Sequence, residues 1–448
     1  RMGELTRDDP ATSIAMFRRY VAAVPADPWG HIALGDEFAR DNRYDEALKE
    51  YDAASVLAPT ERDVVVGKAR VLAAARRTDD AIAVLESWTR AHPNDADALR
   101  DLGDQRRRAG QFLEAAQAYR SAQSQAPLPR IESRLESVLG DAAPAIEIIA
   151  NGSTDSDDNR TYRIGGNADM SIGNRARAGI GGGWKSLTGI FSATVADVFL
   201  ELYARPKSAF RVEATAGAAF TSTDEVLVCG PPPRSPTIGI GSARAVWKQP
   251  GGSAMVDLRA TRSLLDASGE LVRNRVVRNE VAARVDIPLI SRIRFRGGAK
   301  AAAYDALNES NTRTSLLTGL AVSATDAAEI SAVFQEIRFD HSTTSGFFAP
   351  RLAQLAELGT YMEIESSGGS VLALDGGAGA QRVAEFGVAT ADWKPAFRLF
   401  AQLTVPLRPG SQLRAELDSY DSSFGNEAVS SANWRYISGL LSLRFALR

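Results

Sequence analysis

The residue types that most often carry out chemistry are sparse in this sequence. The three histidines, His31, His92 and His341, lie far apart, and the chain has a single cysteine, Cys229. This spacing assembles neither a metal cluster nor a Ser-His-Asp arrangement with any specificity. One cysteine also excludes an internal disulfide framework and a zinc site with several thiolates. We therefore expect a protein that is not an enzyme and that holds no catalytic residue, metal or cofactor.

Two local patterns resemble chemical motifs without meeting their requirements. The glycine run Gly179-Ile180-Gly181-Gly182-Gly183 lacks the lysine and the strand-to-helix context of a phosphate-binding loop, so it predicts strand glycines that face small neighbours. The pair Asp157-Asp158 is more typical of a turn than of acid/base catalysis. A net charge of -3, with 24% charged residues, argues against a nucleic-acid partner.

A 34-residue period organises the first part of the chain. Prolines recur at this spacing, at Pro25, Pro59, Pro93 and Pro127. A bulky residue stands eight positions before each proline, at Phe17, Tyr51, Leu85 and Tyr119, and an alanine stands four positions earlier in three units, at Ala47, Ala81 and Ala115. The second unit adds Leu34, Gly35 and Phe38 on its first helix. The pattern is similar to the tetratricopeptide consensus, in which small residues let two helices touch and proline ends each pair.

The period predicts a helical repeat domain over residues 1–142. Its last segment, Ile131 to Leu139, is expected to form a capping helix that Gly140 ends. Counting back one period from the second unit places the start of the first before Arg1, so we expect the chain to begin inside a repeat of a longer protein. Stacked helix pairs form a curved solenoid with a concave binding surface.

From residue 143 to residue 448 the helical period gives way to alternation of apolar and polar residues. In one such segment Val281, Val285 and Ile287 alternate with charged residues at positions 284 and 286. About sixteen segments of this kind, separated by turn-forming residues, predict an antiparallel transmembrane β-barrel of bacterial outer-membrane type. Because the chain lacks any run of 18 apolar residues, membrane-spanning helices are excluded. The predicted fold is therefore an α-solenoid followed by a barrel in the lipid bilayer.

A soluble β-sandwich, β-helix or propeller remains an alternative for residues 143–448, because its strands would also alternate. Aromatic residues make up only 7% of the chain, which is few for a barrel with two aromatic girdles, and the last residue is Arg448 rather than an aromatic one. The alternative function is a non-catalytic scaffold in which a repeat array carries a soluble, β-rich domain for binding partners. Charge along the whole polar face of several strands favours the barrel.

The charged faces of the predicted strands would line the lumen. The candidate residues on the path of a transported polymer are Arg163, Asp169, Arg211, Glu213, Asp257, Arg259, Arg284, Asp286, Arg292, Arg294, Arg296 and Lys300. Mixed charges of this kind suit a hydrophilic glycan, and aromatic faces can stack on sugar rings. The basic row at positions 292, 294, 296 and 300 would favour an anionic polymer, while a neutral glycan is equally compatible.

A repeat array that runs into a sixteen-stranded barrel resembles the outer-membrane porins that export bacterial exopolysaccharide, such as the cellulose-synthase outer-membrane subunit and the poly-N-acetylglucosamine export porin. A late loop adds to the resemblance: Gly346-Phe347-Phe348-Ala349-Pro350-Arg351 is similar to the Gly-Tyr-Phe-Ser-Pro-Gln stretch of the cellulose-export family, with three polar positions replaced.

The resemblance implies that a polysaccharide leaves an inner-membrane synthase, follows the periplasmic solenoid and crosses the outer membrane through the barrel. The solenoid would also contact the synthase or periplasmic proteins. Two segments could fold inward as a plug or remain plain extracellular loops: Thr221 to Pro236, with its three consecutive prolines, and His341 to Arg351.

Overall fold

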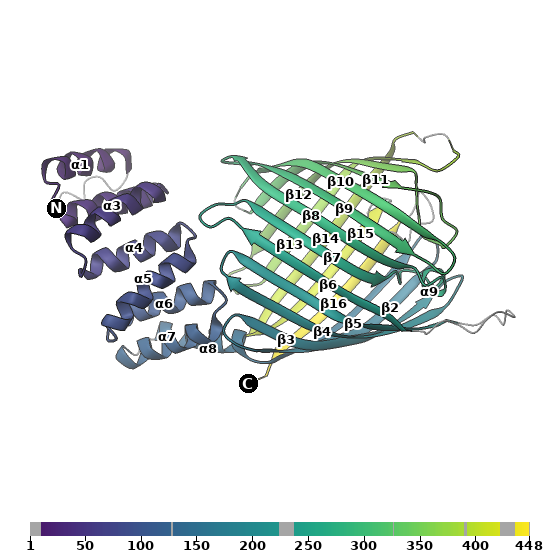
Figure 1. Ribbon diagram of the computed structural model, residues 1–448, viewed down its shortest axis with the longest axis horizontal. Helices are drawn as coiled ribbons and strands as arrows, with labels where there is room; N and C mark the ends of the chain where they lie inside the picture. Colours follow the sequence, from purple (N-terminus) through teal and green to yellow (C-terminus); the bar gives the residue numbers. More distant parts are fainter. Residues whose placement is uncertain are drawn as a thin grey trace.

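The computed structural model describes residues 10–126, 129–223, 237–325, 327–388, 392–421 and 435–447. Helices come first and a closed barrel follows (Figure 1). The helices before the barrel are α1 (Pro10–Ala23), α2 (Pro28–Arg40), α3 (Tyr44–Leu57), α4 (Arg62–Ala74), α5 (Thr78–Ala91), α6 (Ala96–Arg108), α7 (Phe112–Gln125) and α8 (Pro129–Ala142).

Tyr51 shows why the repeats need small residues at fixed positions. Its ring is 2% exposed and fills the space between α2 and α4, where a Cβ on Gly35 or Gly67 would lie 2.9 Å or 2.5 Å from the tyrosine. Its hydroxyl donates a hydrogen bond of 2.6 Å to Asp36. Two periods later Tyr119 packs against Gly103 and donates to Asp104, also at 2.6 Å. The repeat in sequence is therefore a repeat in packing.

The predicted packing residues of the repeats lie in the cores between helices. Those buried to 2% exposure or less are Leu34, Phe38, Ala47, Tyr51, Ala81, Ala115 and Tyr119. Pro25, Pro59 and Pro93 each lie in the turn that follows a second helix, whereas Pro127 falls outside the described residues. Proline in these turns prevents the second helix from continuing into the next repeat.

The expectation that Gly140 ends the capping helix is wrong. Helix α8 runs through Gly140 to Ala142. A Cβ at Gly140 would lie 2.4 Å from the backbone of Pro409, in the turn between strands β14 (Lys394–Arg408) and β15 (Ser411–Asp421). The glycine allows α8 to approach the barrel closely, so its role is in packing rather than in ending the helix.

The strands that follow close into one antiparallel barrel in which each strand pairs with its sequence neighbours and β1 pairs with β16, with Ala145 opposite Ala446. The strands are β1 (Ala145–Asp155), β2 (Arg160–Ser171), β3 (Ala176–Thr188), β4 (Ala193–Lys207), β5 (Phe210–Thr223), β6 (Thr237–Lys248), β7 (Met255–Leu264), β8 (Val277–Ile290), β9 (Ile293–Asp305), β10 (Ser310–Ser323), β11 (Ala328–Phe339), β12 (Leu352–Glu365), β13 (Val371–Ala384), β14 (Lys394–Arg408), β15 (Ser411–Asp421) and β16 (Tyr436–Ala446). The predicted number of sixteen strands is confirmed.

The described helices include none with the length and apolar character needed to cross a membrane.

The barrel has two unlike mouths. We call the mouth beside the helices the proximal mouth and the opposite one the distal mouth. Proximal connections are short, as in residues 208–209 between β4 and β5 and residues 291–292 between β8 and β9. The distal connections include the long segments 265–276 and 340–351, and the first of these carries a short helix, α9 (Gly269–Arg273). Short turns at one end and longer loops at the other are typical of bacterial outer-membrane barrels.

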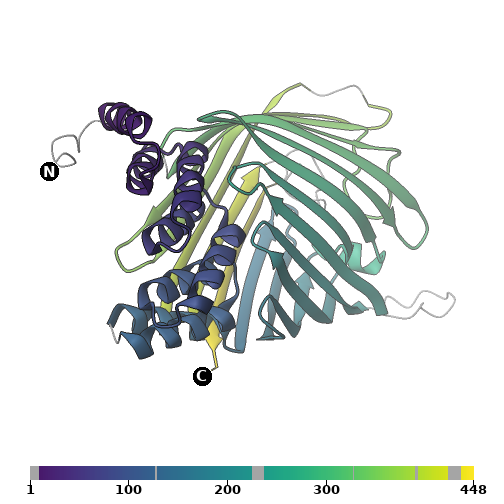
Figure 2. The ribbon, with the colours of Figure 1, turned by 60° about the vertical axis from the view of Figure 1, so that its left-hand side comes forward.

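The solenoid is joined to the rim of the proximal mouth through the first turns of helices α5 and α7 (Figure 2). Asp79, at the start of α5, accepts hydrogen bonds from the amide and the hydroxyl of Ser208 at 3.1 and 2.8 Å. Asn174, between β2 and β3, donates to Glu114 on α7 at 2.7 Å. Successive repeats therefore contact successive barrel turns, which fixes the solenoid along the rim.

Candidate functional site

The two faces of the barrel wall differ sharply in chemistry. Large apolar side chains project from the outer face and remain exposed; examples are Ile164, Met170, Ile180, Trp184, Leu200, Leu258, Val281, Leu316, Ile330, Leu358, Leu399 and Leu441. Charged side chains alternate with them along the same strands and face inward. An apolar outer band with a polar interior is the arrangement that a lipid bilayer requires of a spanning barrel.

A polar cluster marks the distal edge of the outer apolar band. On β11 Glu336 accepts a hydrogen bond of 2.8 Å from Arg338 and one of 2.6 Å from Gln354 on β12. Gln354 in turn accepts one of 2.6 Å from Arg382, whose guanidinium lies 5.0 Å from the ring centre of Trp393. Charged groups and an amphipathic indole at this height fit the boundary between hydrocarbon and water.

Most lumenal arginines are neutralised by carboxylates on the same strand, on the adjacent strand or on the strand beyond it. Arg163 contacts Asp197 at 2.7 Å, and Arg444 contacts Asp169 at 2.8 Å. The other ion pairs of this kind are Arg177–Asp169, Arg211–Glu213, Arg244–Asp257, Arg294–Asp286, Arg296–Asp286, Arg296–Glu329, Arg313–Glu280 and Arg414–Glu147. These pairs connect the inner wall across strands and leave little net charge where they occur.

The structure places the predicted lumenal residues on the inner wall with one exception. Arg292 lies in the proximal turn between β8 and β9, so its assignment to a lumenal basic row is wrong. The row was extrapolated from alternation, which ends where the strand ends. Arg259, Arg284 and Lys300 differ from the other candidates, because they are exposed and make no ion pair with any described residue. A role for any of these residues in contacting a polymer stays a prediction.

The expectation that the glycine run faces small neighbours is also wrong. Gly181 on β3 and Gly217 on β5 flank the inward side chain of Phe199 on β4. A Cβ at Gly181 would lie 2.5 Å from the phenyl ring, and one at Gly217 would lie 2.7 Å from the Cβ of Phe199. The glycines make room for bulky lumenal side chains, which alternation on a single strand does not reveal.

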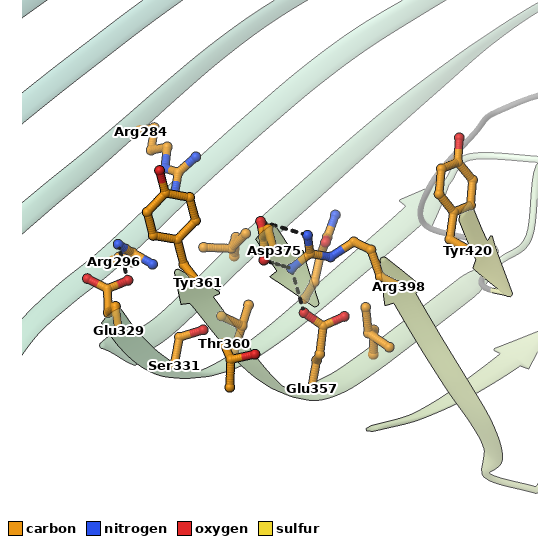
Figure 3. A pocket seen from close by; sticks show the side chains of 14 residues that line it. Arg284, Arg296, Glu329, Ser331, Glu357, Thr360, Tyr361, Asp375, Arg398 and Tyr420 are labelled. Carbon is orange, nitrogen blue, oxygen red and sulfur yellow. Dashed lines mark hydrogen bonds and ion pairs between the residues drawn. The ribbon is translucent and has the colours of Figure 1, made fainter. Parts of the chain in front are cut away.

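A cavity of about 560 Å³ lies inside the barrel along strands β8 to β15 (Figure 3). Figure 3 shows Arg284, Arg296, Glu329 and Tyr361 at one end, and Arg398 and Tyr420 toward the other. Arg398 connects two strands by contacting Glu357 at 3.2 Å and Asp375 at 2.8 Å. The cavity thus offers hydrogen-bond donors, acceptors and two tyrosine rings, a lining suited to a polyhydroxylated chain.

The lumenal tyrosines and Arg398 were not among the predicted site residues. Tyr361 donates a hydrogen bond of 2.8 Å to Glu363, and Tyr420 stacks on Tyr436 with ring centres 4.9 Å apart. The alternation that placed charges in the lumen applies equally to β12, β14 and β15, so the same signal would have found these residues.

Two distal loops fold into the barrel and form what we call the plug, residues 265–276 and 340–351. Helix α9 in the first loop buries Leu271 and Val272 against inward residues on opposite sides of the barrel. Lys185 on β3 contacts Asp266 at 3.0 Å. The two loops are joined by a hydrogen bond of 3.0 Å that the side-chain amide of Asn274 donates to the backbone carbonyl of Ser345. The plug therefore fills part of the distal mouth.

The predicted aromatic motif forms the apolar part of the plug. Phe347 is 4% exposed and packs with Tyr304 and Phe339 on the inner wall. Phe348 and Ala349 pack against the same cluster, and Pro350 is buried. Gly346 adopts a φ of +86°, and a Cβ there would lie 2.7 Å from Glu270 of α9. Of the two loops considered for a plug, residues 341–351 fold inward, whereas residues 224–236 with Cys229 lie outside the described residues.

Helix α9 is the part of the plug that sequence reasoning missed. Ser268 precedes it and its hydroxyl accepts a hydrogen bond from the Leu271 amide, as an N-cap residue does. The sequence did contain a signal for this helix: Ser268, a typical N-cap residue, precedes the apolar Leu271 and Val272 in a connection that is long for a hairpin.

The histidines lie apart in the fold. His31 contacts Glu50 at 2.7 Å within the solenoid, His92 stacks on Trp88 with ring centres 3.8 Å apart, and His341 is exposed at the distal mouth. Within the described ranges there is no group of three or more His, Cys, Asp or Glu side chains placed to hold a metal ion.

Comparison with known proteins agrees with this architecture. Residues 38–102 match a family model described as tetratricopeptide repeat. Curated proteins provide no match to the sequence. Among solved structures, one titled "Bacterial polysaccharide outer membrane secretin" superimposes with a TM-score of 0.50 and 10% sequence identity, covering 68% of this chain and 99% of that chain. At this identity the likeness concerns the fold alone.

Other solved structures resemble only the helical part. The MamA protein of Desulfovibrio magneticus RS-1 is 23% identical over 30% of this chain and 77% of its own, with a TM-score of 0.28. A thermophilic TPR protein of Thermus thermophilus is 18% identical over 31% of this chain and 76% of its own, with a TM-score of 0.27. The expected architecture, tetratricopeptide repeats followed by a sixteen-stranded barrel, is confirmed by the family model and the fold together.

Proposed function

We propose that this protein exports an exopolysaccharide through the bacterial outer membrane. The observation that carries the proposal is the inner wall of the closed sixteen-stranded barrel, whose cavity is lined by paired charges and tyrosine rings. Barrels of this size leave an aqueous channel rather than a packed interior. A polyhydroxylated chain can exchange hydrogen bonds along such a wall, since many weak sites permit movement better than one strong site.

The location follows from the barrel itself. A closed antiparallel barrel with an even strand number and an apolar outer band is an outer-membrane protein, and the solenoid lies at its proximal mouth. Short connections at the proximal mouth place that mouth, and with it the solenoid, on the periplasmic side. The same outer face argues against a soluble β-rich scaffold, because large apolar residues would then face water over the whole barrel.

The solenoid serves in this proposal as a guide and an assembly scaffold. It extends from the rim of the proximal mouth, where Asp79 and Glu114 bond to barrel turns. A groove of about 680 Å³ between α2 and α4 includes the exposed ring of Trp29 and the hydrogen-bonded pair Tyr51 and Asp36. We assign this surface to a synthase subunit or another periplasmic protein, in keeping with the binding surfaces of stacked repeats.

Polymer release from cells tests the proposed function. In a host that makes an exopolysaccharide, deletion of the gene should retain polymer in the periplasm, and the full chain supplied from a plasmid should restore release to the medium. A variant that lacks the repeats but keeps the barrel separates guidance from conduction. Unchanged release from the deletion strain, with an intact synthase, contradicts the proposal.

A further inference from the structure

Three neighbouring lumenal cations stand apart from the neutralised inner wall. Arg259 on β7, Arg284 on β8 and Lys300 on β9 are exposed, and among the described residues none of them has a carboxylate within ion-pair distance. The inner-wall arginines on the strands around them contact acids, as Arg244 contacts Asp257 and Arg313 contacts Glu280. We call Arg259, Arg284 and Lys300 the lumenal cation cluster.

The barrel register brings these three cations to one height. Arg259 and Lys300 both lie directly opposite Ala282, one on each side of β8. Because adjacent strands are about 4.8 Å apart, their Cα atoms are roughly 10 Å apart across a small side chain. Arg284 is two residues further along β8, between Gly298 on β9 and Asp257 on β7, and the Asp257 carboxylate is bound by Arg244 instead. Long side chains on three adjacent strands can therefore converge on one group in the lumen.

The lumenal carboxylates that lack an ion pair show no such gathering. Glu201 on β4 accepts a hydrogen bond of 2.8 Å from Asn167, and Glu363 on β12 accepts one of 2.8 Å from Tyr361. Glu365 on β12 and Asp418 on β15 also make no ion pair with a described residue, but no two adjacent strands carry such acids, whereas the cations occupy three consecutive strands. Asp257 and Glu280, the acids beside Ala282, are bound by Arg244 and Arg313, so the wall around Ala282 has an excess of positive charge.

The cation cluster also borders the cavity with the tyrosine rings. Arg284 lines that cavity together with Tyr361 (Figure 3). A sugar ring stacked on a tyrosine and a carboxylate bonded to a guanidinium are complementary contacts for one acidic sugar residue. Neutral hydroxyl groups need no such excess of positive charge, because paired charges and amides already supply donors.

We infer that the polymer in this lumen carries anionic groups on its sugars, which the lumenal cation cluster binds in passing. This inference rests on the proposed export function and specifies its substrate class. Carboxylates of uronic acid residues are the simplest such groups. Each acidic sugar of the polymer binds the cluster in turn as the polymer advances. The contact stays reversible because the cluster is exposed to solvent.

Binding of short oligosaccharides to the detergent-purified full chain tests the inference. The probes are oligogalacturonate, which carries a carboxylate on each sugar, and cello-oligosaccharide of the same length, which is neutral. The variant is Arg259→Gln/Arg284→Gln/Lys300→Gln. Its matched control is Arg160→Gln/Lys207→Gln/Arg338→Gln, which removes the same charge from exposed cations at strand ends. Calorimetry measures affinity, and heat-modifiable migration in SDS shows that each barrel is folded.

The wild type should bind oligogalacturonate more tightly than the neutral probe, and the cluster variant should lose about tenfold or more in affinity, equal to roughly 1.4 kcal/mol. The control variant should keep wild-type affinity, and added salt should weaken only the cluster-dependent part. Equal affinity for both probes, or a cluster variant that binds like the wild type, overturns the inference and leaves the export proposal standing. Absence of oligogalacturonate binding by the wild type also overturns the inference. The export proposal is tested separately, by measuring polymer release from the deletion strain.

Discussion

The ring of Phe347 stacks on the ring of Tyr304, with centroids 4.9 Å apart and planes inclined by 13°. Tyr304 belongs to the inner wall of β9, and Phe347 belongs to the distal loop between β11 and β12. The contact holds a loop that would otherwise face solvent against the inside of the barrel. It anchors the second plug loop to the inner wall.

Phe347→Ala should open the distal mouth. Loss of a buried phenyl ring from a packed cluster destabilises the packed state by about 3–5 kcal/mol. The remaining contacts of the loop are too few to offset this loss, so the loop should leave the inner wall. We expect ion conductance of the purified protein in planar lipid bilayers to rise several-fold. Ile190→Ala serves as the control, because Ile190 is a distal loop residue that is 87% exposed. Equal conductance of the Phe347→Ala variant and the wild type would show that the plug does not limit the path.

Asp95 should make the stability of the solenoid depend on pH. Burial raises the pKa of its carboxyl, but hydrogen bonds from Arg62, from the Ala98 amide and from the Trp88 indole outweigh burial and lower the pKa to about 2. The ordinary value is about 3.9. Because the folded pKa lies below the unfolded one, the stabilisation is complete above about pH 4 and is lost as the pH falls toward 2, by on the order of 2 kcal/mol.

Thermal unfolding of the helices, followed by circular dichroism of the full chain between pH 5 and pH 2, measures this dependence. Asp95→Asn keeps part of the hydrogen bonding but removes the titration, so its unfolding temperature should be lower at pH 5 and should fall less toward pH 2. The parallel variant Asp52→Asn changes an acid whose side chain is 62% exposed and should follow the wild-type curve. Identical slopes for the wild type and Asp95→Asn would refute the assignment.

A disulfide should lock the solenoid onto the rim without changing its position. Asp79 accepts hydrogen bonds from the Ser208 amide and hydroxyl, so the two backbones are within reach of a cross-link. In a Cys229→Ser background, Asp79→Cys/Ser208→Cys should oxidise readily and keep wild-type polymer release. The control is Val56→Cys/Ser208→Cys, in which residue 56 is 83% exposed in the wild type, and it should form no disulfide within the chain. Comparable cross-linking of both pairs would mean that the solenoid swings freely.

A charge on the lipid face should cost more than the same charge in the lumen. Leu200 on β4 is 63% exposed on the outer face, and Thr215 on β5 faces inward beside Ser242. Leu200→Arg should destabilise the barrel by about 2–4 kcal/mol, because arginine then enters the hydrocarbon layer. Thr215→Arg should change stability little. Urea unfolding in lipid vesicles compares them, and similar losses for both variants would contradict the assignment of the two faces.

Sequence alone was sufficient where the signal is local and periodic. The spacing of Pro25, Pro59 and Pro93 identified the repeats, and alternation around Val281 identified strands with two unlike faces. Both signals come from backbone geometry, which repeats every helix pair or every second strand residue, so they survive without knowledge of partners. The strand number followed from the number of alternating segments between turn-forming residues.

The tertiary structure decided what depends on residues distant in sequence. Gly140 is needed inside helix α8 because Pro409 packs against it, and Gly181 faces Phe199 because β4 is its neighbour. The register places Arg284 directly opposite Asp257, but the Asp257 carboxylate contacts Arg244 on β6, and Arg259, Arg284 and Lys300 contact no described acid. The plug loops show no periodic pattern in the sequence. Their position depends on apolar contacts, such as that of Phe347 with Tyr304, that form only after the barrel closes. Periodicity therefore determined the elements and their faces, and closure of the barrel determined which side chains neutralise, support or obstruct one another.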